Sequence, residues 1–413
     1  MWVFELKTSF VQRSQGKSID MKAIVIGGGI AGCSTAYSLA KRGIVVTLIE
    51  RHENLAQEAS GNPIAVLYPK LTSAPSLNND LTLAGFHYSL NLLKSLPKNP
   101  TLFDTCGLLQ LAFNAREKAR QTLLLQQKNG LKIEKVTVLQ ANNQAGCSLG
   151  GLDGIYLPET AWVNPALWCA ALTQNIEKVF SSEALKLQKS ANDWQVQLAD
   201  KSALEVDMLV ICNANDIKQF SQCASAAITP VRGQINFFAE NEISKNLNTI
   251  VCTDHFIAPA VAGLHTIGTS YATNDINPNL SEKDMHENLQ ALRKIAPELF
   301  KSVKNVQGRV AWRSQTLDYM PLAGQLLDEE MLRNNPPRYN AKPADLPWLR
   351  GLYVNAGHGS KGMISAPICG ELIADLVTGR TLNLSAKLAA KLNPSRFLLR
   401  KLGLKQLSQT LYR

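Results

Sequence analysis

The sequence has no apolar run long enough to cross a membrane. Its 413 residues are 45% apolar and 18% charged, and no uninterrupted apolar stretch approaches the ~18–20 residues of a spanning helix. It has no low-complexity tract, and its first twenty residues lack the continuous apolar segment of a secretory signal. We therefore expect a soluble, cytoplasmic protein of two or three domains at ~150 residues each. Residues 1–20 are expected to form an N-terminal extension, with Met21 as an alternative start.

Paired cysteines and spaced histidines are also missing. No two of the eight cysteines form a C-x-x-C pair, and the six histidines show no metal-ligand spacing. Several cysteines lie in apolar patterns, where a free thiol behaves as a small hydrophobic group. We predict reduced thiols and no metal site.

Acidic residues are absent from the C-terminal part of the chain. No Asp or Glu follows Asp375, whereas eight Lys and Arg residues do, and these make up most of the formal net charge of +10. A patch of one sign suggests a polyanionic partner such as nucleic acid. We predict that residues 381–413 form a basic tail that binds nucleic acid through Arg396, Arg400, Lys401 and Lys405; the alternative is a solvated tail with no partner.

The stretch from Lys22 to Glu50, KAIVIGGGIAGCSTAYSLAKRGIVVTLIE, predicts a strand, a glycine turn, a helix and a second strand. The glycines follow the G-x-G-x-x-G spacing of a dinucleotide site, in which the helix N-terminus faces a pyrophosphate and the final acid holds a ribose hydroxyl. That acid disfavours a phosphorylated ribose, so NADP is not expected. The motif itself does not separate NAD from FAD. The residues assigned to this site are Gly27, Gly29, Ile30, Ala31, Gly32 and Glu50.

The remaining pattern indicates two interleaved units. Helices are expected over 81–96, 115–127 and 164–178, alternating strands between 231 and 315, and a strand–turn–helix over 352–378. We predict an α/β fold in which a Rossmann-type FAD-binding domain is interleaved with an antiparallel-sheet substrate domain. The expected FAD-binding segments are 21–98, 152–228 and 317–380, and the substrate-domain segments are 99–151 and 229–316.

The late turn GHGSKG, between a strand and a helix, resembles the C-terminal flavin motif of the FAD-dependent amine and amino-acid oxidases, which include glycine, sarcosine and D-amino-acid oxidases. This resemblance implies a D-amino-acid oxidase-like fold, FAD as cofactor, and a turn that lies beside the flavin ring. A helix N-terminus there stabilises the negative charge of the reduced flavin. The turn consists of Gly357, His358, Gly359, Ser360, Lys361 and Gly362, and we assign His358 no catalytic role.

The segment GRVAWRSQTLDYMPLAG resembles the superfamily pattern in which an arginine on a strand binds the substrate carboxylate. That residue is Arg313 here, and a guanidinium fork suits a carboxylate better than lysine does. The alternative is a structural ion pair of Arg313 with Asp318. Arg309 is a second, weaker candidate for the carboxylate.

A narrower resemblance, carried by EASGNPIAVLYPKL, WVNPALW, PVRGQINFF, IGTSYA and LNPSRFLLRKL, is to the oxidoreductase half of the tRNA-modifying MnmC family. It implies FAD-dependent removal of the carboxymethyl group from carboxymethylaminomethyl-(2-thio)uridine at the tRNA wobble position. The implied products are aminomethyluridine and glyoxylate. Only twenty residues precede the fingerprint, so we expect a stand-alone oxidoreductase, with a separate methyltransferase acting on the product.

The same resemblance implies further site residues. The loop after the second strand is expected to touch FAD through Arg51, Ser60, Gly61 and Asn62. Tyr271 and Gln234 are expected in the substrate pocket or, equally, in the core of the antiparallel layer; Lys361 stands where the family tends to have arginine. Two other functions stay open: a small-molecule amine oxidase acting on glycine, sarcosine or a D-amino acid, and a tRNA-binding protein without catalysis.

Overall fold

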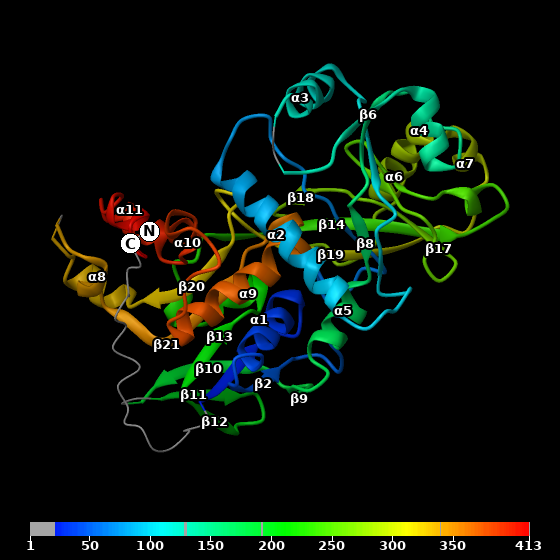
Figure 1. Cartoon of the computed structure of the whole chain (residues 1–413). Coiled ribbons are helices and arrows are strands. Elements are labelled where there is room, and N and C mark those ends of the chain that lie inside the picture. The colour runs from blue at the N-terminus through cyan, green and yellow to red at the C-terminus, as the bar shows by residue number, and fades with distance from the viewer. Residues whose placement is uncertain (1–20, 128–129, 191–192, 339, 413) are drawn as a thin grey trace.

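The computed structural model describes residues 21–127, 130–190, 193–338 and 340–412, so the predicted N-terminal extension lies outside the described residues. Every helix within these ranges is too short or too polar to cross a membrane. The described residues form two large sheets, with helices packed against them, and two three-stranded sheets (Figure 1).

The first sheet is built around β1 (Lys22–Ile26), which pairs in parallel with β2 (Val45–Ile49) and β13 (Met208–Ile211). Its strand order is β20-β21-β13-β1-β2-β9. Strands from distant parts of the sequence complete this sheet. One edge strand is β9 (Glu177–Val179), and on the other side β21 (Trp348–Ala356) is followed by the antiparallel edge strand β20 (Leu322–Leu327). Segments from three predicted ranges therefore meet in one mostly parallel sheet.

Alternation along β1 separates two hydrophobic cores, because successive strand residues point to opposite faces. Ala23 and Val25 pack on the face covered by helices, and Ile24 and Ile26 pack on a three-stranded sheet. The helices are α1 (Ile30–Ala40), α2 (Leu77–Ser95), α5 (Pro165–Leu172) and α9 (Gly362–Thr378); the small sheet is β10 (Ala184–Lys189), β11 (Trp194–Leu198) and β12 (Ala203–Val206).

The helix predicted over 164–178 is wrong in its second half. Asn164 caps α5 as its pattern indicates, accepting from the backbone of Leu167, but the helix ends at Leu172. Glu177–Val179 instead forms β9, which pairs in parallel with β2. Pairing with a strand far away in sequence overrides the local helical pattern.

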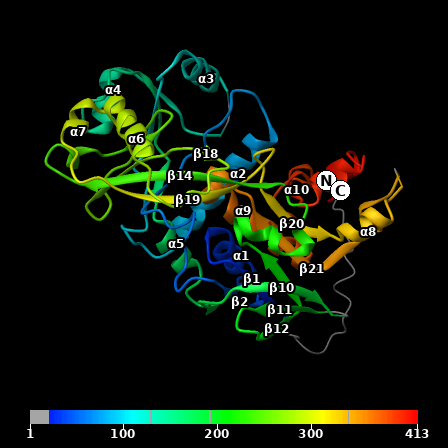
Figure 2. The same cartoon turned by 180° about the vertical axis from the view of Figure 1, so that it is seen from behind.

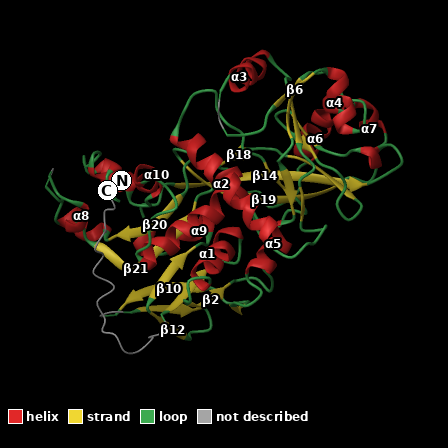
Figure 3. Ribbon diagram, in the orientation of Figure 1, coloured by secondary structure: helices red, strands yellow, loops and turns green. Residues whose placement is uncertain are grey.

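The second sheet is organised by a long antiparallel ribbon of β14 (Ile228–Ala239) and β19 (Gln307–Thr316). The remaining strands run in the order β14-β17-β16-β15-β5-β7-β6, with β18 also on β14. Figure 3 shows α4, α6 and α7 at the end of this sheet far from α10. The bounds are β5 (Leu108–Leu111), β6 (Glu134–Val136), β7 (Gly154–Leu157), β15 (Ile250–Cys252), β16 (Phe256–Ile257), β17 (Leu264–Gly268), β18 (Ala272–Thr273), α3 (Ala115–Leu125), α4 (Val138–Ala145), α6 (Glu282–Ile295) and α7 (Pro297–Lys301).

The first crossover back to the parallel sheet falls later than residue 152. Strand β7 pairs with β5 and β6 in the second sheet, although its residues lie in a range that we assigned to the cofactor domain. A short sheet of β3 (Ala65–Leu67), β8 (Ala161–Val163) and β4 (Phe103–Asp104) follows the order β3-β8-β4.

The C-terminal residues are folded and not a solvated tail. Helices α10 (Ala386–Leu392) and α11 (Arg396–Lys401) pack with β20, α2 and α8 (Glu329–Asn334) through the apolar side chains of two core clusters. Figure 2 shows α10 and the C-terminus beside β20. Aliphatic burial thus fixes a segment that the charge pattern alone presented as a tail.

Candidate active site

A cavity of about 460 Å³ lies between the two sheets. Both glycine turns, the end of β2, the loop after it and residues of the second sheet line its wall. This volume is in the range of small-molecule and cofactor sites. Most of the residues singled out in the sequence are therefore brought together.

The first glycine turn has the close approaches that its spacing predicts. Gly27 has a φ of +109°, which L side chains rarely adopt. A Cβ on Gly32 would overlap the carbonyl oxygen of Gly27, so only glycine lets α1 lie this near the turn. The backbone N–H of Ile30 at the start of α1 donates to Ser60 Oγ at 3.0 Å. The helix N-terminus and Ser60 both border the cavity.

The carboxylate of Glu50 is fixed by backbone groups. Oε2 accepts from the N–H of Gly28 at 2.6 Å, and Oε1 accepts from the N–H of His52 at 2.9 Å. Glu50 is buried and borders the cavity. Each carboxylate oxygen keeps a lone pair for a further donor, which fits the ribose hydroxyl expected there. Gly28 and His52 were not singled out, although both neighbour predicted residues in sequence.

The loop after β2 is held by Arg309 rather than by a ligand. Arg309 donates to Asn62 Oδ1 at 3.0 Å and to the carbonyl of Gln57 at 2.7 Å. A Cβ on Gly61 would come within 2.6 Å of the same guanidinium. Burial lowers the pKa of Arg309, and the side chain does not line the cavity. The expectation that Arg309 could bind the substrate carboxylate is therefore corrected: its donors are used to fix this loop.

Arg51 also holds this loop in place. It forms ion pairs with Glu58 and, at 3.0 Å, with Asp216. Like Asn62 it borders the cavity, whereas Gly61 does not.

The second glycine turn lines the opposite part of the cavity. All six of its predicted residues, 357–362, border the space, and α9 starts at Gly362. His358 Nδ1 lies 2.9 Å from Ser365 Oγ, and its buried Nε2 has no hydrogen-bond partner in the described chain. Burial lowers the pKa of His358 to about 3, so its ring is neutral.

Lys361 reaches across from this turn to α2. Its ammonium donates to Thr82 Oγ1 at 3.0 Å and to Asn78 Oδ1 at 3.4 Å. Burial lowers the pKa of this lysine. No carboxylate is paired with it among the ion pairs of the described residues, so it adds positive charge to the cavity wall.

Arg313 enters the same cavity from β19. Its Nη2 donates to Thr269 Oγ1 at 2.8 Å, and its buried Nη1 has no partner within the described residues. Burial lowers the pKa of Arg313. The alternative pairing with Asp318 does not occur, because Asp318 binds Lys391 and Arg396, each at 2.7 Å. A guanidinium with an unused donor is therefore available to a ligand.

Tyr271 covers Arg313 from outside the cavity. Its ring centroid is 5.8 Å from Arg313 Cζ, and its hydroxyl donates to Gln315 Oε1 at 2.7 Å. The side chain is 53% exposed and does not line the cavity. Tyr271 thus lies beside a lining residue, Arg313, rather than in the pocket.

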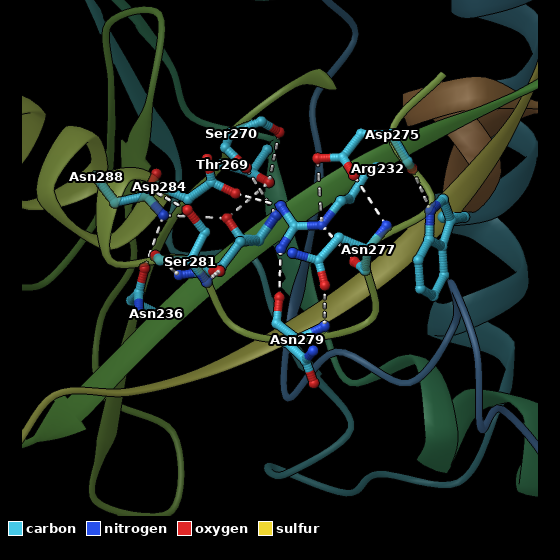
Figure 4. Close-up of polar contacts among 12 residues, drawn as sticks. Arg232, Asn236, Thr269, Ser270, Asp275, Asn277, Asn279, Ser281, Asp284 and Asn288 are labelled. Carbon is cyan, nitrogen blue, oxygen red and sulfur yellow. Dashed lines mark hydrogen bonds and ion pairs between the residues drawn. The ribbon is translucent and has the colours of Figure 1, made fainter. Parts of the chain in front are cut away.

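Gln234 is not at the site. Its side chain forms a pair of hydrogen bonds with the backbone of Ser281, at 3.0 Å to the carbonyl and 2.8 Å from the N–H. Figure 4 shows Ser281 near Arg232, which donates to the carbonyls of Asn277 and Asn279 and pairs with Asp284. The network fastens the segment 274–281 over the β14–β19 ribbon. The pocket expectation for Gln234 is therefore corrected to a structural role in the antiparallel layer.

The predicted nucleic-acid tail also needs correction at one residue. Arg396 is 0% exposed and donates to Asp318 and to the carbonyl of Met320, so it cannot contact a partner. Arg400 lies 3.9 Å from Asp318 and is partly exposed. Lys401 and Lys405 are exposed.

Other lining residues were also missed in the sequence, and Gln110 is a buried polar one. Gln110 stands in the apolar strand β5, and it is fully buried. Its Nε2 donates to the carbonyl of Thr253 at 3.0 Å, whereas its Oε1 has no partner in the described part of the chain. A single polar residue inside CGLLQLAF is the signal that could have identified it.

Comparisons with known proteins agree with this geometry. Residues 22–376 match the family model "FAD dependent oxidoreductase" (DAO). The chain is 40% identical over 392 residues to "tRNA 5-methylaminomethyl-2-thiouridine biosynthesis bifunctional protein MnmC" of Methylobacillus flagellatus, and 39% identical over 402 residues to the protein of that name from Pseudomonas syringae. These alignments cover 94% and 93% of the chain but 60% and 59% of the relatives. The chain thus spans about 60% of the length of the curated relatives it matches.

Solved structures of oxidases share the fold. Glycine oxidase from Geobacillus kaustophilus has a TM-score of 0.74 at 19% identity, covering 91% of this chain and 99% of that one. Iminodiacetate oxidase from Chelativorans sp. BNC1 has the same TM-score and identity, covering 88% and 97%. The predicted fold class is confirmed.

Proposed function

The chain belongs to the FAD dependent oxidoreductase family, and on this premise we propose that it acts on tRNA. The proposed reaction oxidatively removes the carboxymethyl group from carboxymethylaminomethyl-(2-thio)uridine at the wobble position. The products are aminomethyluridine and glyoxylate. The reaction consumes one water molecule and reduces one FAD.

The observation that carries the proposal is the unpartnered Nη1 of Arg313 in the cavity that both glycine turns line. The modified base ends in a secondary amine bearing CH2–COO⁻, which is an N-substituted glycine. Arg313 would bind this carboxylate with charge-assisted hydrogen bonds, and Thr269 would hold the guanidinium plane through its bond to Nη2. The CH2 group is then fixed at one place in the cavity.

The residues of both turns fit FAD. The N–H groups at the start of α1 would face the pyrophosphate, and Glu50 would accept from the ribose. The turn over 357–362 and the start of α9 would lie against the flavin ring. When bound, FAD accepts the hydride that leaves the substrate CH2 group.

The protein's own groups favour the reactive form of the substrate. Lys361 and Arg313 both line the cavity, and two positive charges disfavour protonation of the substrate amine. A neutral amine nitrogen supports loss of hydride from the adjacent carbon, giving an imine. Water then hydrolyses the imine to the primary amine and glyoxylate.

The tRNA part of the proposal rests on relatives. Two proteins about 40% identical over most of this chain carry tRNA thiouridine biosynthesis in their names. Because the chain spans about 60% of their length, we propose only the oxidative step for it.

The test is a flavin spectrum under anaerobic conditions. FAD-loaded protein is mixed with tRNA carrying carboxymethylaminomethyluridine and, separately, with glycine or sarcosine. We expect the tRNA to bleach the flavin with release of one glyoxylate per flavin. Bleaching by the free amino acids alone would contradict the proposal and favour a small-molecule amine oxidase.

A further inference from the structure

Three large side chains are exposed close in sequence or in space to residues that line the cavity. Tyr271 is 53% exposed, Leu317 73% and Tyr319 66%. Tyr319 also has a φ of +57°, a backbone conformation that is strained for a bulky residue and is often retained at functional sites. We call these three residues the entrance rim.

Side-chain and backbone contacts connect the rim to residues that line the cavity. Tyr271 lies over Arg313 and donates to Gln315, and Gln315 forms a β-bridge with His358 of the second glycine turn. Leu317 follows Thr316, the last residue of β19, and a Cβ on Gly357 of the same turn would come within 2.8 Å of Thr316 Cγ2. The rim therefore lies close to Arg313 and His358, which line the cavity.

The turn that carries Leu317 and Tyr319 is held in place by a buried residue. It connects β19 to β20, between α2 and α10 (Figure 1). Met320 is buried in a cluster with Leu81 of α2 and Leu388 of α10. The two exposed side chains thus stand on an anchored turn.

Positive charge lies directly beside this turn. The one carboxylate of Asp318 is shared by Lys391 at 2.7 Å, Arg396 at 2.7 Å and Arg400 at 3.9 Å. The cluster carries an excess of two positive charges, and the side chains of Lys391 and Arg400 are 22% and 33% exposed. Such charge attracts an anion rather than the apolar face of a protein.

We propose that the entrance rim, with Lys391 and Arg400, binds the unpaired nucleotides that flank the target uridine in the anticodon loop. This proposal rests on the proposed function. Proteins bind single-stranded nucleic acid by combining aromatic platforms, on which bases stack, with cations that meet the phosphates. The rim and the cluster beside Asp318 supply both parts at one entrance.

The need for such a surface follows from the size of the site. A cavity of about 460 Å³ that also takes part of FAD admits one base and its side chain. The base must leave the stack to enter, so its neighbours lose a stacking partner. Tyr271 and Tyr319 replace that partner at the entrance.

The first test measures binding of an unmodified anticodon stem-loop RNA to the FAD-loaded full chain by fluorescence anisotropy. Stacking on an aromatic side chain contributes about 1–3 kcal/mol per base, so Tyr319→Ala is expected to raise Kd about 5- to 150-fold. Leu317→Ser is expected to raise it less, and Tyr319→Phe to leave it unchanged. Leu139→Ser, at a 69% exposed position on α4, is the matched control.

A second measurement separates the rim from the chemistry. The free nucleoside carboxymethylaminomethyluridine needs no flanking nucleotides, so Tyr319→Ala is expected to oxidise it at the wild-type rate while kcat/KM for modified tRNA falls. Arg400→Gln is expected to lower the slope of log Kd against log salt by about one.

The possible outcomes distinguish a failure of the rim proposal from a failure of the proposed function. If wild type, Tyr319→Ala and Leu317→Ser bind the stem-loop with equal affinity, the proposed role of the rim is wrong, even if modified tRNA is oxidised. Weakened stem-loop binding in these variants, with no oxidation of tRNA by wild type, would support the rim and reject the proposed function.

Discussion

Arg313 donates from Nη2 to the hydroxyl of Thr269 at 2.8 Å, while its buried Nη1 has no partner among the described residues. A buried donor without a partner is costly, and a bound carboxylate would satisfy it. We expect Arg313→Lys to lose the fork geometry and to raise KM for the substrate about 10- to 150-fold, from about 1.5–3 kcal/mol per charged hydrogen bond. Steady-state kinetics measures this; Arg380→Lys, at an exposed position, is the control. An unchanged KM would remove Arg313 from the substrate site.

Glu50 offers a test of cofactor binding. In Glu50→Gln one carboxylate oxygen becomes an amide NH2 that cannot accept from Gly28 or His52, which now donate to the carboxylate. We expect the Kd for FAD, followed by flavin fluorescence, to rise at least about tenfold. Wild-type FAD affinity in this variant would show that Glu50 does not contact the ribose.

Gly32 should tolerate no side chain. Its Cβ would overlap the Gly27 carbonyl, whereas a Cβ on Gly362 would find its nearest atom at 3.7 Å. We expect Gly32→Ala to cost about 2 kcal/mol or more and to lower Tm, and Gly362→Ala to leave Tm nearly unchanged. The reverse order would contradict this account of helix packing.

Asp318 should make stability depend on pH. Its ion pairs with Arg396 and Lys391 lower the pKa of the carboxyl below its ordinary value. The contribution of these ion pairs to the free energy of unfolding is fully present above the unfolded pKa of about 4. It is lost as pH falls through the folded pKa. Asp318→Asn leaves the buried Arg396 unpaired and should cost about 3 kcal/mol at pH 7. The difference in Tm between wild type and variant should shrink below about pH 4; a constant difference would contradict the ion-pair role.

His358 should make stability depend on pH in a higher range than Asp318 does. Because burial lowers its pKa to about 3, protonation in the unfolded chain near pH 6.5 favours unfolding as pH falls. We expect the Tm of His358→Gln to fall less between pH 7 and pH 4 than the Tm of wild type does. The pH dependence of kcat between 6 and 8 should show no step from this ring, which a titration of the imidazole in the FAD-loaded enzyme by NMR would check.

Local patterns predicted the parts of the fold that local geometry determines. The glycine spacing placed Gly27 and Gly32 correctly, because a tight turn and a close helix approach depend on a few neighbouring residues. Short apolar, β-branched runs predicted the parallel strands, and alternating strands separated by turns predicted the antiparallel layer. Both glycine turns were assigned to one site, and they line one cavity.

The sequence could not indicate partners that lie far along the chain. Arg309 reads like Arg313 on the same strand, yet it fixes a loop about 250 residues earlier. Arg396 reads as one of several tail cations, yet it is buried against Asp318. Gln234 was predicted as a pocket residue, yet both its amide nitrogen and its amide oxygen are hydrogen-bonded to the backbone of Ser281. In each case the tertiary contact, and not the residue type, decides between a free and a structural side chain.

The separation of the two glycine turns in the sequence has a consequence for biosynthesis. Gly27 and Gly362 are about 335 residues apart, and at ~5–20 residues per second roughly 20–70 s pass between their translation. The central strand β1 receives its partner β13 only in the middle of that interval, and β21 arrives at its end. A long nascent chain therefore emerges from the ribosome before its cofactor site is complete, so FAD can be captured only late in synthesis. Until β13 is made, one apolar edge of β1 lacks its partner strand, and it is the segment that a chaperone would have to shield.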